Sequence, residues 1–365
     1  LDATRSKASG NASFPMPIEP DTEFRGGLEV VSYELDIWGR IRRANEAALA
    51  ELAADTAVMH GVRSSLAANV AQVYFQTLAL DKQLALLSRL HATRSDNEQL
   101  QKLRLDSGLI SPYDYEQARS ETAAVAAQLP GLRESRRQAL TALAVLRGAT
   151  PEVMFTAWAS PQDLAEFSLP DAPAVPMDLP SDMLARRPDV IAAEQRLIAA
   201  NARIGVAKAD YFPRLSLGGF FGGLSTSFST LDADSSRNWN AAVAASVPLT
   251  NLREIGTRVD SASAATEAAA ASYAGTVQLA FQEALNAMGA VESTLEVRTA
   301  QQQRVAALEN AYRISTARYD VGRIGYLELL DVERQLRQIE QQQVEAQLAQ
   351  LQATVDLYRA LGGGW

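Results

Sequence analysis

The hydrophobic pattern of the chain is dominated by two very long stretches with helical spacing, residues 43–106 and 257–320. No proline interrupts either one. In the first stretch, apolar residues recur every seven positions, as in a coiled-coil seam: Leu66, Val73, Leu80 and Leu87. Each stretch has 64 residues, so at about 1.5 Å per residue each predicts a helical rod about 96 Å long.

Shorter segments alternate between apolar and other residues and predict strands. They lie at about 1–10, 28–37, 214–222 and 238–249. In the second segment Val31, Tyr33, Leu35 and Ile37 alternate with polar residues, and Leu215, Leu217, Gly219 and Phe221 mark the third. Polar loops are expected at about 10–26 and 224–240. This alternation is typical of a half-buried strand in an ordinary sheet and also of a membrane β-barrel strand, so the pattern alone leaves both open.

An internal repeat relates the two halves of the chain at one constant offset. Residues 104–110 read RLDSGLI and residues 318–324 read RYDVGRI, so arginine, aspartate, glycine and isoleucine coincide. The same offset pairs Gly148 with Gly362. It also pairs Leu1 with Leu215, so we expect Leu1 to enter a strand where Leu215 enters its own.

The repeat divides the chain into a first copy at 1–148, a linker at 149–180 and a second copy at 181–365. The linker holds six prolines. A helix is expected at 181–210 and a return helix at 112–147, and together the two are about as long as one rod. The second return helix is expected at 326–361. Two short helices stacked end to end therefore match one long helix.

A glycine turn is expected between each rod and its return helix. In the sequence DSGLISPYD, Gly108 suits the left-handed end of a helix. Ser111 is a good N-cap, and Pro112 suits the first helical position. The turns are therefore set by local backbone chemistry.

Composition excludes several classes of function. The net charge is −9 and the charges are scattered, which predicts no nucleic-acid partner. There is no cysteine, so disulfides and thiolate metal sites are impossible. His60 and His91 stand far apart on the first rod, and no catalytic constellation, metal site or cofactor site is expected. No run of about 18 apolar residues predicts a spanning helix. The chain begins without methionine or a signal segment, which favours a processed or truncated chain.

Three segments carry a resemblance to a known family. They are SYELDIWGRIRRANEAALA at 32–50, LARRPDVIAAEQRLIAANARIGVAKADYFPRLSL at 184–217, and LYRALGGGW at 357–365. They resemble the outer-membrane efflux proteins of the TolC family, and most of all multidrug outer-membrane factors of the NodT and OprM type. The resemblance covers essentially the whole chain.

The resemblance implies a mainly α fold with a small β part. Three protomers would form a 12-stranded outer-membrane β-barrel continued by a 12-helix periplasmic α-barrel. It implies an exit duct of a tripartite efflux system that carries drugs or other small molecules outward, with no enzymatic activity. The implied partners are a homotrimer, a periplasmic adaptor protein, an inner-membrane transporter of the RND type and outer-membrane lipid.

The resemblance also implies roles for the two turns. Tyr319, Asp320, Leu327 and Asp331 would form the periplasmic gate, with Leu327 at an apolar constriction and Asp331 in an acidic ring. Residues that would dock the adaptor are Gly108, Leu109, Ile110, Ser111, Gly322, Ile324, Gly325 and Tyr326. A plainer interpretation of Asp331 is an acid in the first helical turn, favoured by the helix dipole.

Other residues depart from the family pattern or have structural roles. Where relatives carry a proline, an aromatic residue and two glycines before the second rod, this chain reads VPLTNLREIG at 247–256. Arg187 and Asp189, in the family marker at 186–189, are expected to cap and pack helices. A preceding helix and a lipid-bearing cysteine, found in many relatives, would lie outside the given chain.

Two other functions compete with the efflux duct. An exit duct for type I protein secretion needs the same rods and barrel. A soluble coiled-coil scaffold needs only the rods, and it leaves the alternating segments at 28–37 and 238–249 without a role. Dependence of solubility on detergent separates the scaffold from both ducts.

Overall fold

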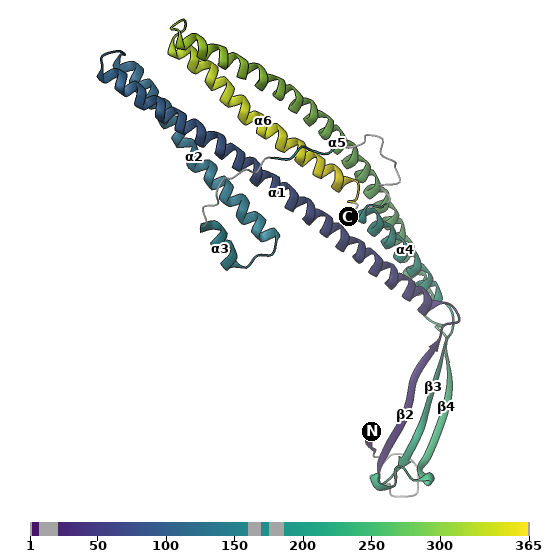
Figure 1. Ribbon diagram of the computed structural model, residues 1–365. Coiled ribbons are helices and arrows are strands. Elements are labelled where there is room, and N and C mark those ends of the chain that lie inside the picture. Colours follow the sequence, from purple (N-terminus) through teal and green to yellow (C-terminus); the bar gives the residue numbers. More distant parts are fainter. Residues whose placement is uncertain (1, 7–20, 160–168, 175–185, 364–365) are drawn as a thin grey trace. The chain divides into compact units, whose positions relative to one another are not determined.

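The computed structural model describes residues 2–6, 21–159, 169–174 and 186–363 (Figure 1). The chain forms two compact units, one from Leu1–Asp55 with Ala193–Tyr273 and one from Thr56–Ala192 with Ala274–Trp365. The first unit contains the strands, and the second contains most of the helical rods. The units therefore cut across the two sequence copies, since each unit takes residues from both.

The first unit holds a four-stranded antiparallel sheet with strand order β1-β2-β3-β4. The strands are β1 Asp2–Ser6, β2 Asp21–Leu35, β3 Arg214–Ser225 and β4 Arg237–Ser246. Strand β2 begins well before the predicted 28–37, inside a segment expected to be a polar loop, because ladder hydrogen bonds join backbone groups and tolerate polar side chains. Strand β4 ends before Pro248, which has no N–H to donate to a ladder.

The pairing of β1 differs from the repeat alignment. Ser216 pairs with Ala244, so the repeat would pair Asp2 with Val30, whereas Asp2 pairs with Arg25. Residues 2–6 do form a strand, as expected for part of 1–10. Leu1 and residues 7–10 lie outside the described residues, so the expectation for Leu1 stays a prediction.

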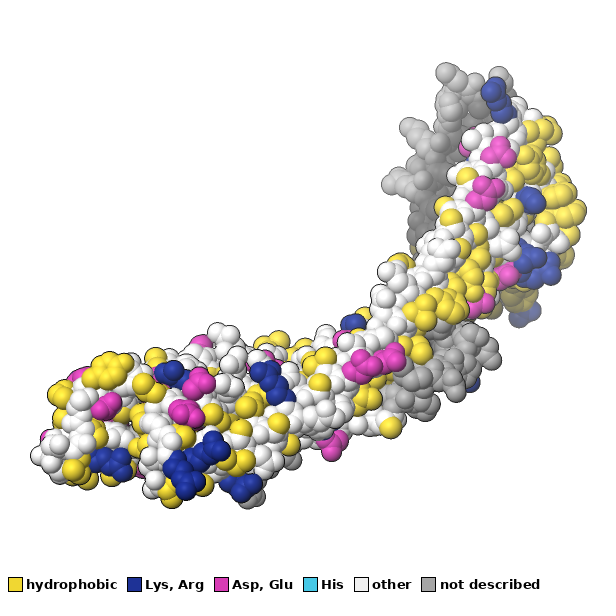
Figure 2. Space-filling model, turned by 90° about the horizontal axis from the view of Figure 1, so that it is seen from above, with side chains coloured by type: hydrophobic (Ala, Val, Ile, Leu, Met, Phe, Trp, Pro, Cys, Tyr) yellow, Lys and Arg dark blue, Asp and Glu magenta, His cyan; other side chains and the backbone are white. Residues whose placement is uncertain are grey.

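The two faces of the sheet differ in chemistry. Directly opposite residues share a face, so the pairs recorded between β2, β3 and β4 define one apolar face. Its members are Leu28, Val30, Tyr33, Leu35, Leu215, Leu217, Gly219, Phe221, Trp239, Ala241, Val243 and Ala245. The opposite face includes Arg25, Glu29 and Asn240. Figure 2 shows hydrophobic side chains gathered on one side of the sheet.

A β-bulge in β2 breaks the simple alternation predicted for 28–37. Val30 pairs with Gly219 and Tyr33 with Leu217, so three steps along β2 match two along β3. Leu28 and Val30 therefore share a face with Tyr33, although their numbers differ in parity. The regular alternation predicted from Val31 onward is interrupted at its start, because the register shift lies between Val30 and Tyr33.

The helices are α1 Arg40–Asp106, α2 Pro112–Leu146, α3 Pro151–Ala159, α4 Pro188–Ala209, α5 Leu252–Asp320 and α6 Tyr326–Ala360. Helix α1 starts slightly before the predicted position 43, because the Asp36 carboxylate accepts the N–H groups of Ile41 at 2.8 Å and Arg42 at 2.9 Å. Helix α5 likewise starts before the predicted 257. Figure 1 shows α1 with α2 and α5 with α6 as two helical hairpins.

The hairpins have matching ends at the sequence offset. Helices α1 and α5 end at Asp106 and Asp320, which the repeat places at equivalent positions. Helices α2 and α6 begin at Pro112 and Tyr326, which are equivalent in the same alignment. The glycines that follow these two helices, Gly148 and Gly362, both have positive φ. The repeat therefore extends from the sequence to the backbone of both hairpins.

The linker contains a helix that was not predicted from the sequence. Helix α3 starts at Pro151, inside the segment expected to be a proline-rich linker. Proline is tolerated at the first helical position, so Pro151 begins this helix instead of excluding it. Helix α4 begins at Pro188 and not at 181, and residues 181–185 lie outside the described residues.

The helical core is thin and lies along the hairpin seams. Leu84 and Leu87 of α1 pack with Val125 and Leu129 of α2. In the other hairpin, Val305 of α5 packs with α6 in a cluster that includes Leu336 and Ile339. Of the predicted heptad positions in α1, Leu80 and Leu87 are buried, whereas Leu66 is 43% exposed.

Candidate functional site at the hairpin tips

The two hairpin turns have the same backbone geometry. Gly108 has a φ of 73° and Gly322 a φ of 70°, the left-handed region that favours glycine. The N–H of Leu109 donates to the carbonyl of Arg104 at 2.8 Å, and the N–H of Arg323 donates to that of Arg318 at 2.9 Å. These bonds are those of a Schellman motif, so both rods end in the same way.

The return helices begin differently. Ser111 caps α2 with a full capping box: its side chain accepts the N–H of Asp114, and the Asp114 carboxylate accepts the N–H of Ser111. Gly325 caps α6 without a side-chain hydrogen bond. The capping role predicted for Ser111 and the first position predicted for Pro112 are confirmed.

The eight residues proposed for adaptor docking all lie in these two turns or at the helix starts beside them. Leu109 is 75% exposed, and Gly108, Ser111, Gly322 and Gly325 are also exposed. The remaining three, Ile110, Ile324 and Tyr326, are partly buried. Figure 2 shows acidic and basic side chains interspersed with hydrophobic ones on the visible face of the helices.

The four predicted gate residues lie on both sides of the second turn. Tyr319 and Asp320 are the last residues of α5, and Leu327 is the second residue of α6 and 56% exposed. Asp331 is exposed, and its carboxylate accepts a hydrogen bond from Gln335 Nε2 at 2.7 Å. Asp331 does not lie in the first turn of α6, as the plainer interpretation required, because the helix already begins at Tyr326. The acid in that turn is Glu328.

Two tyrosines connect the second turn to α1. The rings of Tyr319 and Tyr326 lie 6.1 Å apart between centroids. Asn97 Nδ2 donates to the Tyr326 hydroxyl at 2.7 Å, and Arg104 Nη1 donates to the Tyr319 hydroxyl at 3.4 Å. Burial raises the pKa of Tyr326, and the charge of Arg94 and the bond from Asn97 offset this only in part. Tyr326 therefore stays a neutral hydrogen-bonding group.

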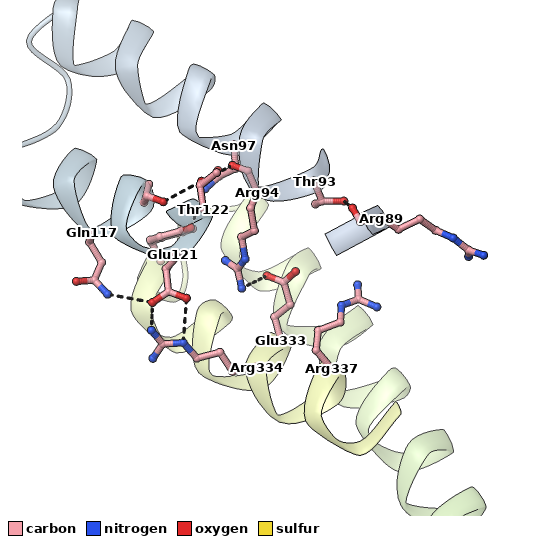
Figure 3. A network of polar contacts seen from close by, with 12 residues as sticks. Arg89, Thr93, Arg94, Asn97, Gln117, Glu121, Thr122, Glu333, Arg334 and Arg337 are labelled. Atoms are coloured by element: carbon pink, nitrogen blue, oxygen red, sulfur yellow. Dashed lines mark hydrogen bonds and ion pairs between the residues drawn. The ribbon is translucent and has the colours of Figure 1, made fainter. Parts of the chain in front are cut away.

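A network of charged and polar side chains lies close to these tyrosines (Figure 3). Arg94 of α1 and Glu333 of α6 form an ion pair with 3.2 Å between Nη2 and Oε2. Their side chains are only 5% and 9% exposed. Beside them, Arg334 of α6 forms an ion pair with Glu121 of α2, and Thr122 of α2 donates to the Arg94 carbonyl. The network joins the two hairpins.

The Arg94–Glu333 pair was not predicted from the sequence, although the sequence carries a signal for it. The seven-residue series through Leu80 and Leu87 continues to Arg94 and Gln101, and both are buried. In α6, Glu333 falls at a buried position between Leu330 and Leu336. Charged residues in the register of a seam are the pattern that would have identified the pair.

Arg187 joins three helices elsewhere in the second unit. It is buried, and its Nη1 donates to the carbonyl of Ala360, the last residue of α6, at 2.7 Å. Its Nη2 pairs with Asp189 at 2.7 Å and with Glu283 of α5 at 2.6 Å. The capping and packing role expected for the segment 186–189 is confirmed.

Two kinds of feature are absent from the described residues. No group of three or more histidine, aspartate or glutamate side chains in this part of the chain could hold a metal ion. None of the described helices is long and apolar enough to cross a membrane.

Comparison with known sequences identifies relatives over nearly the whole length. The profile of the outer membrane efflux protein family matches residues 4–149 and 179–363. The chain is 34% identical over 344 residues to the pyoverdine export outer membrane protein OpmQ of Pseudomonas putida, which covers 94% of this chain and 71% of that protein. It is 31% identical over 358 residues to the outer membrane protein OprJ of Pseudomonas aeruginosa, covering 98% and 73%.

Solved structures with the same fold are outer-membrane channels. The outer-membrane channel OprN matches with a TM-score of 0.86 and 31% identity, covering 100% of this chain and 80% of that one. The open state of the MtrE outer membrane channel of Neisseria gonorrhoeae matches with a TM-score of 0.82 and 30% identity, covering 100% and 79%. The chain belongs to the outer membrane efflux protein family and serves as an outer-membrane exit duct of an efflux system.

Proposed function

We propose that three copies of this chain assemble into one duct, a 12-stranded β-barrel in the outer membrane continued by a 12-helix periplasmic tunnel. The observation that carries this proposal is the exposed apolar face of the four-stranded sheet. Leu28, Trp239 and Val243 of this face are each at least 74% exposed in a single protomer. Lipid would cover such a face, and closure of three sheets into a barrel would remove their free edges.

The cargo and partners follow from the relatives. Among these are a toluene efflux pump outer membrane protein and a solvent efflux pump outer membrane protein of Pseudomonas putida. Together with the pyoverdine exporter, they indicate cargoes of different chemistry, and we infer that this duct exports drugs or other small molecules. A periplasmic adaptor would dock on the two turns, around Leu109 and Ile324, and deliver substrate from an inner-membrane transporter of the RND type.

The second turn is the proposed gate. In a trimer, three Leu327 side chains would narrow the tunnel and three Asp331 carboxylates would form an acidic ring that favours cations. The exposure of both side chains in one protomer supports this assignment. Tyr319, with its hydroxyl bonded to Arg104 of α1, would hold the gate closed, together with the neighbouring Asp320.

Single-channel recording in planar lipid bilayers tests the gate. Asp331→Ala should reduce cation preference, while stability changes by less than about 1 kcal/mol because the side chain is exposed and beyond the first turn. Leu327→Ala should raise conductance by widening the constriction. Substitution of Tyr319 and Asp320 together should raise it further.

Chemical crosslinking in detergent tests the assembly and should give a three-chain species. A stable monomer at micromolar concentration would contradict the duct. Wild-type selectivity and conductance in all the gate variants would leave Leu327 and Asp331 as ordinary surface residues of the helix.

A further inference from the structure

The contact between α1 and the start of α6 is made by polar side chains. Leu80 and Leu87 fill two successive seven-residue positions of α1, and Arg94 and Gln101 fill the next two. In α6, Glu333 lies at a buried position within an apolar series. A polar residue at a seam position lowers stability but specifies how two helices align.

The two charges depend on each other. Arg94 and Glu333 are more than nine-tenths buried, and they meet in the 3.2 Å ion pair. Among the described residues, Arg94 Nε and Glu333 Oε1 have no hydrogen-bond partner, so the ion pair and the contact of Arg94 with the Tyr326 hydroxyl offset the loss of water. Removing one member of such a pair leaves a buried charge, which is strongly unfavourable.

The surrounding contacts are specific to one axial position. Gln101 Nε2 donates to Asn97 Oδ1 at 3.3 Å, and Asn97 in turn donates to Tyr326 at the start of α6. An apolar seam tolerates sliding of one helix along another, whereas the directional bond from Asn97 to Tyr326, which crosses from α1 to α6, forms in one alignment only. Figure 3 shows Arg94 reaching from α1 to Glu333 on α6.

We propose that Arg94 and Glu333 are positioning residues of the gate, which fix the start of α6 at one position along α1 and thereby hold the second turn closed. This inference rests on the proposed gate function. When α6 leaves α1, the polar contacts become hydrated, whereas the apolar contacts at Leu84, Leu87, Leu336 and Ile339 stay packed within each hairpin. Each hairpin therefore stays a packed pair of helices when the turn opens.

Spin-label distance measurement on the full chain tests the proposal directly. The chain has no cysteine, so Leu109→Cys and Val321→Cys place one label on each turn, at positions 75% and 67% exposed. In this background Glu333→Gln keeps the side-chain shape and removes the charge. We expect the population with longer distances between the turns to rise at least about tenfold.

Three further variants make the result specific. Arg94→Met with Glu333→Met removes both charges and should restore the parent distance distribution, because apolar replacement of a buried pair is often neutral. Arg334→Gln is the matched control: it breaks the adjacent ion pair to Glu121, with Arg334 52% exposed, and should leave the distances unchanged. Glu333→Asp keeps the charge with a shorter reach and should give a smaller shift in the same direction.

The outcomes separate this proposal from the gate itself. Unchanged distances in Glu333→Gln and Glu333→Asp overturn the positioning role, as does an equal shift in Arg334→Gln or in the double methionine variant. Conductance of the same variants in planar bilayers tests the gate independently. A longer distance with wild-type conductance leaves the positioning pair standing and overturns the gate assignment.

Discussion

The two hairpin turns share a backbone but are held by different interactions. The turn between α1 and α2 is stabilised within itself, by the capping box of Ser111 and Asp114 and by Pro112 at the first helical position. The turn between α5 and α6 has a glycine cap without a side-chain bond. Its side-chain hydrogen bonds come from another helix, through Asn97 and Arg104 of α1.

This difference shows which turn can move. A turn stabilised by its own residues keeps its conformation whatever its neighbours do. A turn held by tertiary contacts can be released when those contacts are broken, without unfolding either helix. The second turn is therefore suited to be the moving part of a gate and the first to be its fixed counterpart.

The largest effect is expected from removing the Tyr326 hydroxyl. Tyr326→Phe leaves the partly buried Asn97 amide without its acceptor, which costs about 2 kcal/mol. Hydrogen exchange of the amides in the first turn of α6 should accelerate by about 30-fold. Tyr319→Phe is the control, since the 3.4 Å bond that it removes is long and the change should be smaller. Equal rates in wild type and Tyr326→Phe would show that α1 does not hold this turn.

A smaller, local effect is expected at the first turn. Ser111→Ala removes the capping box and should destabilise the start of α2 by about 1 kcal/mol, with about fivefold faster exchange there. The amides at the start of α6 should exchange at the wild-type rate. If they also accelerate, the two turns are coupled and the comparison between them fails.

The smallest effect is a gain of stability at the second turn. Gly325 has an extended backbone, with φ −78° and ψ 160°, and open space around its Cβ position, so Gly325→Ser can supply the missing cap. Hydrogen exchange at the start of α6 should slow, because a serine cap is more stable than a glycine cap by a few tenths of a kcal/mol. Gly322→Ser is the matched contrast: its φ of 70° should make the same change destabilising. Faster exchange in Gly325→Ser would mean that α6 needs the glycine for another reason.

Local signals predicted the helix ends well. Gly108, Ser111 and Pro112 act through their own backbone preferences, so the sequence around them determines the turn. The repeat then predicts the same kind of helix end at Gly322. Helix α3 was not predicted, because the six prolines of 149–180 indicate a linker, although proline at the first helical position is compatible with a helix.

The candidate site was predicted only in part, because some of its contacts join residues that are far apart in the sequence. The resemblance points to Tyr319, Leu327 and Asp331 through their motif. Nothing local to Arg94 shows that its partner is Glu333, which lies in another helix near the far end of the chain. Arg94 and Glu333 are each unusual at a seam position, but only the packing of the hairpins shows that they form a pair.

The bulge in β2 has a consequence for the course of the strand. Leu28 and Val30 lie on the apolar face before it, and Tyr33 lies on the same face after it, so one residue of β2 is left over opposite Gly218. Deleting Ser32 would leave every one of these side chains on its present face and give a regular ladder. The extra residue therefore leaves the chemistry of the sheet unchanged and adds local twist and bend. Curvature and facial chemistry are encoded separately in this strand, so one can be altered without the other.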